Sequence, residues 1–269
     1  MSTATSSTDG LEVIQVKYGE RVTQKSVVFH DYAGYGQPDG DLHMEYNYWI
    51  LRQGDQLILF DTGYDISARD WLGERSVLPP PESLKLLGVD PRAVSMVITS
   101  HFHYDHIGYL SLFTEAQVVS AQAEYDYWFA KWASDSLDGE FTVADNLEAV
   151  RTAEQEGRLR LVDRQTDVWP GVTVYPVGGH CPGQLVTLVR SQSGPRILAA
   201  DAAHFYEQLD NQWPFFAFTD LGEMRRALAF INQLASSTGA VVVPGHDGRV
   251  RDRFPALAGN AASIAIVLG

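Results

Sequence analysis

The chain has 269 residues, of which 45% are hydrophobic and 20% charged, a composition typical of a globular protein with a buried core. Its formal net charge of −14 argues against a nuclease or any other protein that binds a nucleic-acid backbone, because such binding depends on clustered lysine and arginine. The same charge slightly disfavours an anionic substrate.

Residues 1–10 are polar and are expected to form a flexible tail, followed by a single domain over residues 11–269. No basic segment precedes an apolar one in the tail, and no stretch reaches the roughly 18 apolar residues of a membrane span. A secretion signal and a membrane partner are therefore not expected. Because the single cysteine, Cys181, cannot form an internal disulfide bond, we expect a cytoplasmic protein in a reducing compartment.

The first half of the chain begins with a predicted β-hairpin. Residues 46–52 and 56–60 are strand-like runs, and the Gln-Gly-Asp sequence at 53–55 forms the turn between them. The three prolines at 79–81 cannot continue a helix, so a short helix is expected only after them, over residues 82–87.

Further strands and helices alternate irregularly along the rest of the chain. Strands are predicted at residues 95–99, 172–177, 185–189, 197–200 and 240–243, and helices at 121–133 and 221–234. Runs of strands separated by isolated helices favour sheets covered by helices over a single alternating parallel sheet.

The segment that follows the strand expected at 95–99 carries the most specific motif. It places His101, His103, Asp105 and His106 within six positions. Two-residue spacing in extended backbone directs His101 and His103 to the same side, and a turn into a helix would direct the other two to a neighbouring point. Solvated surface histidines are disfavoured, because three of the chain's eight histidines lie in this segment. Mixed imidazole and carboxylate ligation with room for water is typical of hydrolytic metal centres.

Three single residues lie where strand-like runs give way to loops. These are His180 in a Gly-Gly-His-Cys-Pro-Gly sequence, Asp201 after residues 197–200, and His246 in Pro-Gly-His-Asp. Each alone is more often a loop residue than a ligand. Together with the first motif they complete a candidate set of metal ligands.

The chain resembles the metallo-β-lactamase superfamily, and within it the N-acyl homoserine lactonases. The resemblance covers most of the chain and rests on motifs in the family's order: Phe60-Asp61-Thr62-Gly63, the segment from His101 to His106, Gly179-His180 with Pro182-Gly183, Asp201, and Gly245-His246. It implies an αββα sandwich, in which two central mixed β-sheets are flanked by helices.

The resemblance also implies two divalent metal ions per chain. His101, His103 and His180 would bind one ion, Asp105, His106 and His246 would bind the other, and Asp201 would bridge them. Zinc is the expected metal, with iron, manganese and cobalt as alternatives. The resemblance and the general prevalence of two-fold assemblies favour a homodimer.

The function that the resemblance implies is hydrolysis of a lactone, including N-acyl homoserine lactone, and hence quorum quenching. A hydroxide between the two cations would attack the carbonyl carbon, and Asp105 would relay the proton. Hydrolysis of another small carbonyl substrate, an amide, lactam, ester or thioester, is the alternative. A metal-binding protein without turnover is not favoured, because every expected ligand is present.

His204 is the place where the sequence departs from the lactonases. Many of them carry a tyrosine three residues after the bridging aspartate, directed at the substrate carbonyl, and His204 occupies that position. An imidazole can donate the same hydrogen bond, so His204 is a catalytic candidate beside Asp105, with a packed histidine as the alternative. Because His204 replaces this tyrosine, the sequence does not identify the substrate.

Several other residues have a structural or packing role as an expected role or as an alternative. Asp61 is expected to be structural, since an aspartate in an Asp-Thr-Gly turn bonds to nearby backbone. Cys181 is expected to pack without binding metal, because adjacent residues of an extended loop point apart. The loop at residues 32–41 is either a lid or an ordinary connection. The aromatic residues at 213–218 form either packing or a pocket wall.

Overall fold

The computed structural model describes residues 10–65 and 77–269, so the expected tail at 1–10 lies outside the described residues except for Gly10. The larger of its two sheets has seven strands in the order β12-β1-β2-β3-β4-β5-β6. Their bounds are β1 Glu12–Gln24, β2 Asp41–Gln53, β3 Gln56–Phe60, β4 Val94–Ile98, β5 Gln117–Ala121, β6 Leu159–Val162 and β12 Ala265–Val267. Pairing is antiparallel from β12 to β3 and parallel from β3 to β6.

The second sheet has five strands in the order β11-β10-β9-β8-β7. They are β7 Thr166–Trp169, β8 Val172–Pro176, β9 Leu185–Ser191, β10 Gly194–Ala200 and β11 Val241–Pro244. Only β10 and β11 run parallel, so this sheet is mixed as well.

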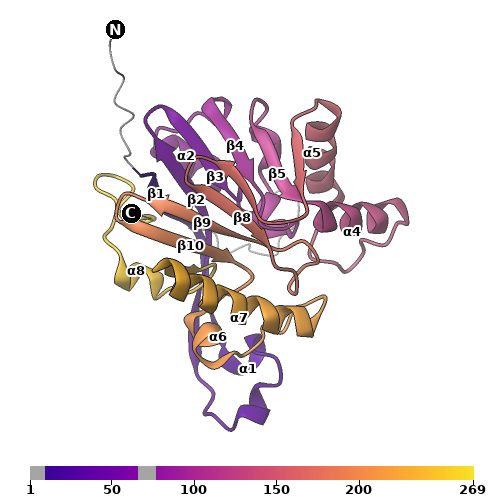
Figure 1. Cartoon of the computed structure of the whole chain (residues 1–269), viewed down its shortest axis with the longest axis vertical. Helices are drawn as coiled ribbons and strands as arrows, with labels where there is room; N and C mark the ends of the chain where they lie inside the picture. The colour runs from indigo at the N-terminus through magenta and orange to yellow at the C-terminus, as the bar shows by residue number, and fades with distance from the viewer. Residues whose placement is uncertain (1–9, 66–76) are drawn as a thin grey trace.

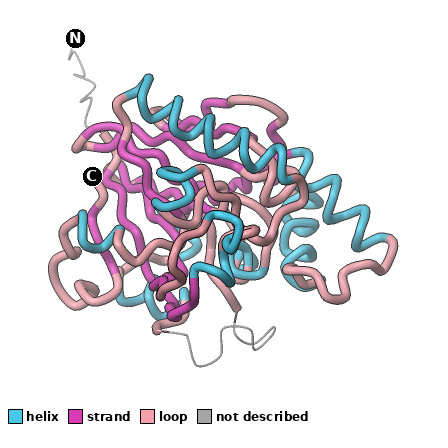
Figure 2. Tube along the Cα trace, turned by 90° about the horizontal axis from the view of Figure 1, so that it is seen from below, coloured by secondary structure: helices cyan, strands magenta, loops and turns pink. Residues whose placement is uncertain are grey.

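Helices lie on the outer faces of the two sheets (Figures 1 and 2). The α-helices are α1 Lys25–Val28, α2 Pro80–Leu86, α3 Tyr104–Ile107, α4 Gln122–Ala133, α5 Ala144–Gln155, α6 Tyr206–Asn211, α7 Leu221–Thr238 and α8 Val250–Arg253. The 3₁₀ helices are η1 Tyr32–Tyr35, η3 Pro91–Ala93 and η4 Leu110–Leu112. No helix among the described residues is long and apolar enough to cross a membrane.

Successive apolar side chains of a strand point to opposite faces of its sheet, so each sheet packs against the other sheet on one face and against helices on the other. In β2, Trp49 faces the second sheet while Ile50 faces the outer helices. In β10, Leu198 faces the first sheet and Ile197 packs with Leu228 of α7. A sheet with two apolar faces needs a cover on each of them. The predicted αββα sandwich of two mixed sheets is confirmed, whereas the assignment of residues 11–269 to one domain stays a prediction.

Most predicted elements occur, but some bounds were wrong. Helix α2 begins at Pro80 and not after the third proline, because the first turn of a helix needs no backbone N–H donor and tolerates proline. Helix α7 continues to Thr238 and ends at Gly239, whose φ of 69° is the left-handed conformation of a helix C-terminus. The long strand β1 was not foreseen, because a register shift between Lys17 and Gly19 interrupts its alternation.

Candidate metal centre

The candidate ligands meet at one edge of the two sheets, because each follows the end of a strand. After β4 the chain stays extended through His101 and His103, and then turns into helix α3, which carries Asp105 and His106. The chain thus makes the helical turn that directs Asp105 and His106 to a neighbouring point. The rings of His101 and His103 lie 4.5 Å apart, centroid to centroid.

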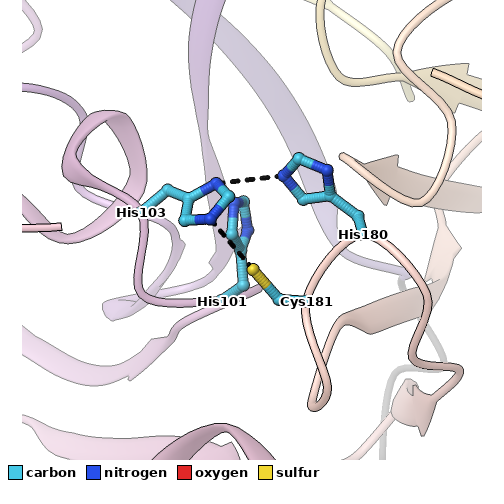
Figure 3. A group of neighbouring side chains, drawn as sticks. All are labelled: His101, His103, His180 and Cys181. Atoms are coloured by element: carbon cyan, nitrogen blue, oxygen red, sulfur yellow. Dashed lines mark hydrogen bonds between the residues drawn. The ribbon is translucent and has the colours of Figure 1, made fainter. Parts of the chain in front are cut away.

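His180 reaches the same point from the loop between β8 and β9. Its Nε2 lies 3.0 Å from Nδ1 of His103 (Figure 3). Its Nδ1 lies 2.9 Å from the carbonyl oxygen of Ala217. Because that carbonyl only accepts, the hydrogen of the neutral ring is on Nδ1, and the lone pair of Nε2 faces Nδ1 of His103. Gly179 has φ of 96°, and a Cβ there would lie 2.4 Å from the backbone nitrogen of Met224, so only glycine fits beside α7.

Asp201 lies at the centre of the cluster, directly after β10. Its Oδ1 is 2.9 Å from Nε2 of His246 and 3.2 Å from Nε2 of His106. Its Oδ2 is 3.3 Å from Nε2 of His180 and 3.9 Å from Nε2 of His101. One carboxylate oxygen therefore faces each group of histidines, which is the arrangement expected of a bridging ligand.

His246 comes from the end of β11. Its Nδ1 lies 2.7 Å from the carbonyl oxygen of Glu45, which directs Nε2 toward Asp201, and Oδ2 of Asp105 is 4.0 Å from that Nε2. Ligand atoms of Asp105, His106 and His246 all lie within 4.8 Å of one another, and so do those of His101, His103 and His180. The structure thus brings together all seven residues that the sequence singled out.

The donor set fits divalent cations. Nε2 of His101 and Nε2 of His106 are buried and have no hydrogen-bond partner among the described residues, although both point at carboxylate oxygens. Burial lowers the pKa of His101, His103 and His180, so these rings are neutral and offer lone pairs. Converging lone pairs around a carboxylate repel one another unless a cation lies between them.

The carboxylate of Asp201 stays charged despite burial. Burial disfavours the charged form of Asp201, but His204, His106 and His246 outweigh it and hold its pKa well below the usual range. Burial also disfavours charge on His106, yet Asp201, Asp105 and Asp61 raise its pKa well above the usual value. The centre therefore attracts positive charge.

Asp61 orients one of the candidate ligands. It accepts hydrogen bonds from the backbone N–H of Ser100 at 2.6 Å and from Nδ1 of His106 at 2.8 Å. The backbone bond agrees with the structural role expected for Asp61. The contact with His106 was not foreseen, because it joins residues 45 positions apart. It leaves Nε2 of His106 for Asp201 or a cation.

Cys181 lies closer to the centre than the sequence suggested. Its Sγ is 3.1 Å from Nε2 of His103, the nitrogen that faces away from His180 (Figure 3). The expectation that Cys181 points away from the ligands was wrong, because the left-handed glycines 178 and 179 bend the loop out of an extended path. In this arrangement the thiol contacts the ring of His103 on the side opposite His180 and helps to hold its orientation.

Glu124 on α4 is a buried residue that sequence reasoning missed. Its carboxylate accepts hydrogen bonds from the backbone N–H of Phe102 and of Gly183, both at 2.9 Å, and from Nε1 of Trp128 at 2.6 Å. It therefore joins the loop of His101 and His103 to the loop of His180. The only feature of the sequence that pointed to this residue was its position four residues before Trp128, which places both side chains on one face of the helix.

A pocket of about 140 Å³ opens above the centre. The buried residues that line it are Met44, Tyr46, His103, Asp105, His180, Asp201, His204, Phe215 and His246, and the more exposed ones, which form its rim, are Arg21, Tyr104, Phe141, Phe216 and Ala217. Of the aromatic cluster, Phe215 and Phe216 thus form a pocket wall. Trp213 instead stacks on Tyr35 of η1 at 4.8 Å, and neither Trp213 nor the loop at 32–41 lines the pocket.

His204 lies in the pocket as a neutral ring. Burial lowers its pKa to about 3, and its ring stacks on Phe215 with centroids 3.5 Å apart. Its Nε2 lies 2.9 Å from Oδ2 of Asp201, while its buried Nδ1 has no hydrogen-bond partner among the described residues. The hydrogen of His204 is therefore on Nε2 and is donated to Asp201.

Comparison with known proteins places this geometry in a family. Residues 44–246 match the family model described as the metallo-beta-lactamase superfamily. The N-acyl homoserine lactonase AttM of Azorhizobium caulinodans is 32% identical over 180 residues, which are 61% of this chain and 62% of AttM. An N-acyl homoserine lactonase of Bacillus sp is 27% identical over 217 residues, which are 74% of this chain and 80% of that protein.

Solved structures agree on the fold. A quorum-quenching N-acyl homoserine lactone lactonase superimposes with a TM-score of 0.73 at 20% identity, covering 91% of this chain and 95% of the other. AidC, described as a dizinc quorum-quenching lactonase, gives a TM-score of 0.69 at 20% identity and covers 88% of each chain.

Proposed function

This chain belongs to the metallo-beta-lactamase superfamily, and we propose that it is a metal-dependent hydrolase that opens a lactone. The observation that carries the proposal is the set of imidazole nitrogens that converge on Asp201 beneath a pocket with an aromatic wall. The names of the relatives support an N-acyl homoserine lactone as the first substrate to test.

We assign the ligands to two cation sites that share Asp201. One site takes His101, His103 and His180, and the other takes Asp105, His106 and His246. Zinc fits this donor set best, and iron, manganese and cobalt are accepted by the same ligands. When bound, the cations supply Lewis-acid chemistry, since they polarise a carbonyl group and lower the pKa of bound water to about 7.

Asp105 and His204 are the residues that we expect to touch the reacting groups. The Oδ2 atom of Asp105 lies 3.6 Å from Nε2 of His106, and Asp105 lines the pocket, so its second oxygen can hold the proton that passes to the leaving alcohol. His204 also lines the pocket. Its Nε2 hydrogen is donated to Asp201, so a hydrogen bond from His204 to the substrate carbonyl would have to use the same hydrogen.

The pocket supports a small reacting group with an apolar extension. A volume of about 140 Å³ holds a lactone ring but not a long chain. Phe141 and Phe216 line the rim and are 42% and 45% exposed, so an acyl chain that leaves the pocket would cover them.

The test is turnover by metal-loaded protein against matched substrates. We expect hydrolysis of homoserine lactones, with little activity on esters, β-lactams and thioesters of similar size, and we expect chelation to abolish it. Full occupancy by metal without cleavage of any lactone would overturn the proposal. Turnover of another substrate on the panel would establish the alternative, a hydrolase of a different carbonyl compound.

A further inference from the structure

Arg21 places a positive charge at the rim of the pocket. It lies on β1, opposite Met44 on β2, and lines the pocket together with Tyr104 and Asp105. It is half-buried, and Nε donates to Sδ of Met44 at 3.3 Å. Thioether sulfur is a weak acceptor, so this bond satisfies little of the five-donor guanidinium.

The neighbouring carboxylates do not neutralise Arg21. No described carboxylate oxygen lies within 4.0 Å of its guanidinium. Glu20, the preceding residue, is held by Lys17 at 2.6 Å, and Glu45 on β2 is held by the same Lys17 at 3.3 Å. Glu20 and Glu45 are thus engaged by another cation.

The guanidinium also lies beside apolar side chains. Phe141 and Phe216 form the apolar part of the rim, and Met44 lines the pocket with them. Arg21 is the only arginine or lysine among the described residues that line the pocket. A planar fork of N–H donors matches a carboxylate with two parallel hydrogen bonds, and such charge-assisted bonds are about twice as strong as neutral ones.

We propose that Arg21 binds an anionic group of the substrate, a carboxylate carried on the chain that leaves the lactone ring. This inference rests on the proposed function and names the substrate class within it. It also revises the expectation from the net charge of −14, which disfavoured an anion. Charges on distant surfaces are screened over about 10 Å, whereas a half-buried guanidinium acts directly at the pocket.

Binding tests the inference without turnover. Glutarate and pentanoate share a five-carbon chain and differ by one carboxylate, and adipate and hexanoate form the same pair one carbon longer. We expect metal-loaded protein to bind the better dicarboxylate about 10- to 100-fold tighter than its monocarboxylate partner. In Arg21→Met this preference should disappear, while Arg21→Lys should keep part of it.

A matched control separates local from general charge effects. Arg92 on η3 is an exposed residue paired with Asp90, remote from the pocket, and Arg92→Met removes the same charge. This variant should keep the full preference for dicarboxylates. Equal binding of both members of each pair by the unmodified protein, or an equal loss in Arg92→Met and Arg21→Met, would overturn the inference.

Turnover distinguishes this inference from the proposed function. N-succinyl and N-butanoyl homoserine lactone have four-carbon acyl groups and differ by a terminal carboxylate. We expect a higher kcat/KM for the succinyl compound, and a loss of about 10- to 100-fold for it alone in Arg21→Met, expressed in KM. Hydrolysis of both at equal rates would contradict the role of Arg21 and leave lactone hydrolysis standing. Cleavage of neither, with the preference for dicarboxylates intact, would contradict the lactonase proposal alone.

Discussion

Nε2 of His204 lies 2.9 Å from Oδ2 of Asp201, so the residue at the position of the lactonase tyrosine holds the carboxylate that both groups of histidines face. Because burial keeps the His204 ring neutral, it has one hydrogen to donate, and Asp201 accepts it. Contact with a substrate carbonyl and support of Asp201 therefore compete for the same hydrogen.

Replacing His204 separates these two roles. We expect His204→Phe to lower kcat/KM by about 10- to 10³-fold, the scale of one lost donor, with metal content unchanged at saturating metal. His204→Tyr should restore part of the activity, because a phenol donates a comparable bond. The measurements are kcat/KM, bound metal and Tm. Unchanged kcat/KM in the Phe variant would remove His204 from the catalytic residues.

Asp201→Asn tests the shared ligand. The substitution keeps the shape but removes the charge that faces both groups of histidines. We expect the metal content to fall from about two ions per chain to about one, and the rate to fall by at least about 10²-fold. Elemental analysis and kinetics give the two values. Near-normal activity with both ions retained would show that Asp201 does not bridge.

Asp61→Asn tests whether ligand orientation limits metal binding. An amide cannot supply the charged acceptor that now holds Nδ1 of His106 at 2.8 Å. We expect affinity for one of the two ions to fall about 10- to 100-fold, the usual cost of losing such a partner, as measured by competition with a chelator. Asp90→Asn, in the exposed turn before η3, is the control and should leave both affinities unchanged.

Glu124→Gln tests the link between the two ligand loops. The amide can accept from Phe102 or Gly183, but its NH₂ group then faces the other backbone N–H. We expect the free energy of unfolding to fall by about 1–3 kcal/mol, the cost of an unsatisfied buried group. Metal affinity at His101 and His103 should fall too. A stable variant with weakened metal binding would support the positioning role, whereas unchanged values for both would refute it.

Acidification should destabilise the metal-free protein. Burial lowers the pKa of four rings: His101, His103, His180 and His204. Below about pH 6.5 the unfolded chain binds more protons at these positions than the folded chain, so stability falls as the pH falls. The raised pKa values of His106 and of the buried carboxyl groups of Asp61, Glu45 and Glu124 act in the opposite direction. We expect the four rings to outweigh them, because carboxyl groups take up protons mainly at lower pH than imidazoles do. Urea unfolding with a chelator, from about pH 7 to about pH 5, measures the effect. Constant or rising stability over this range would contradict it.

The sequence by itself predicted the fold class and the candidate ligands. The spacing of His101, His103, Asp105 and His106 is local, so a strand followed by a helical turn was enough to predict where they point. The ends of the strands were recognisable from apolar runs, and the αββα sandwich followed from the family resemblance that these motifs carry. Elements with broken alternation, such as β1, could not be recognised in this way.

Only the tertiary structure decided which residues surround the ligands. Asp61 meets His106 across 45 positions, Glu124 joins loops that are 81 positions apart at Phe102 and Gly183, and Arg21 reaches the pocket from the other end of the chain. Ligand types recur in short patterns, because a metal centre needs donors at fixed spacing. Their supporting contacts depend on how separate layers pack, which no local pattern records.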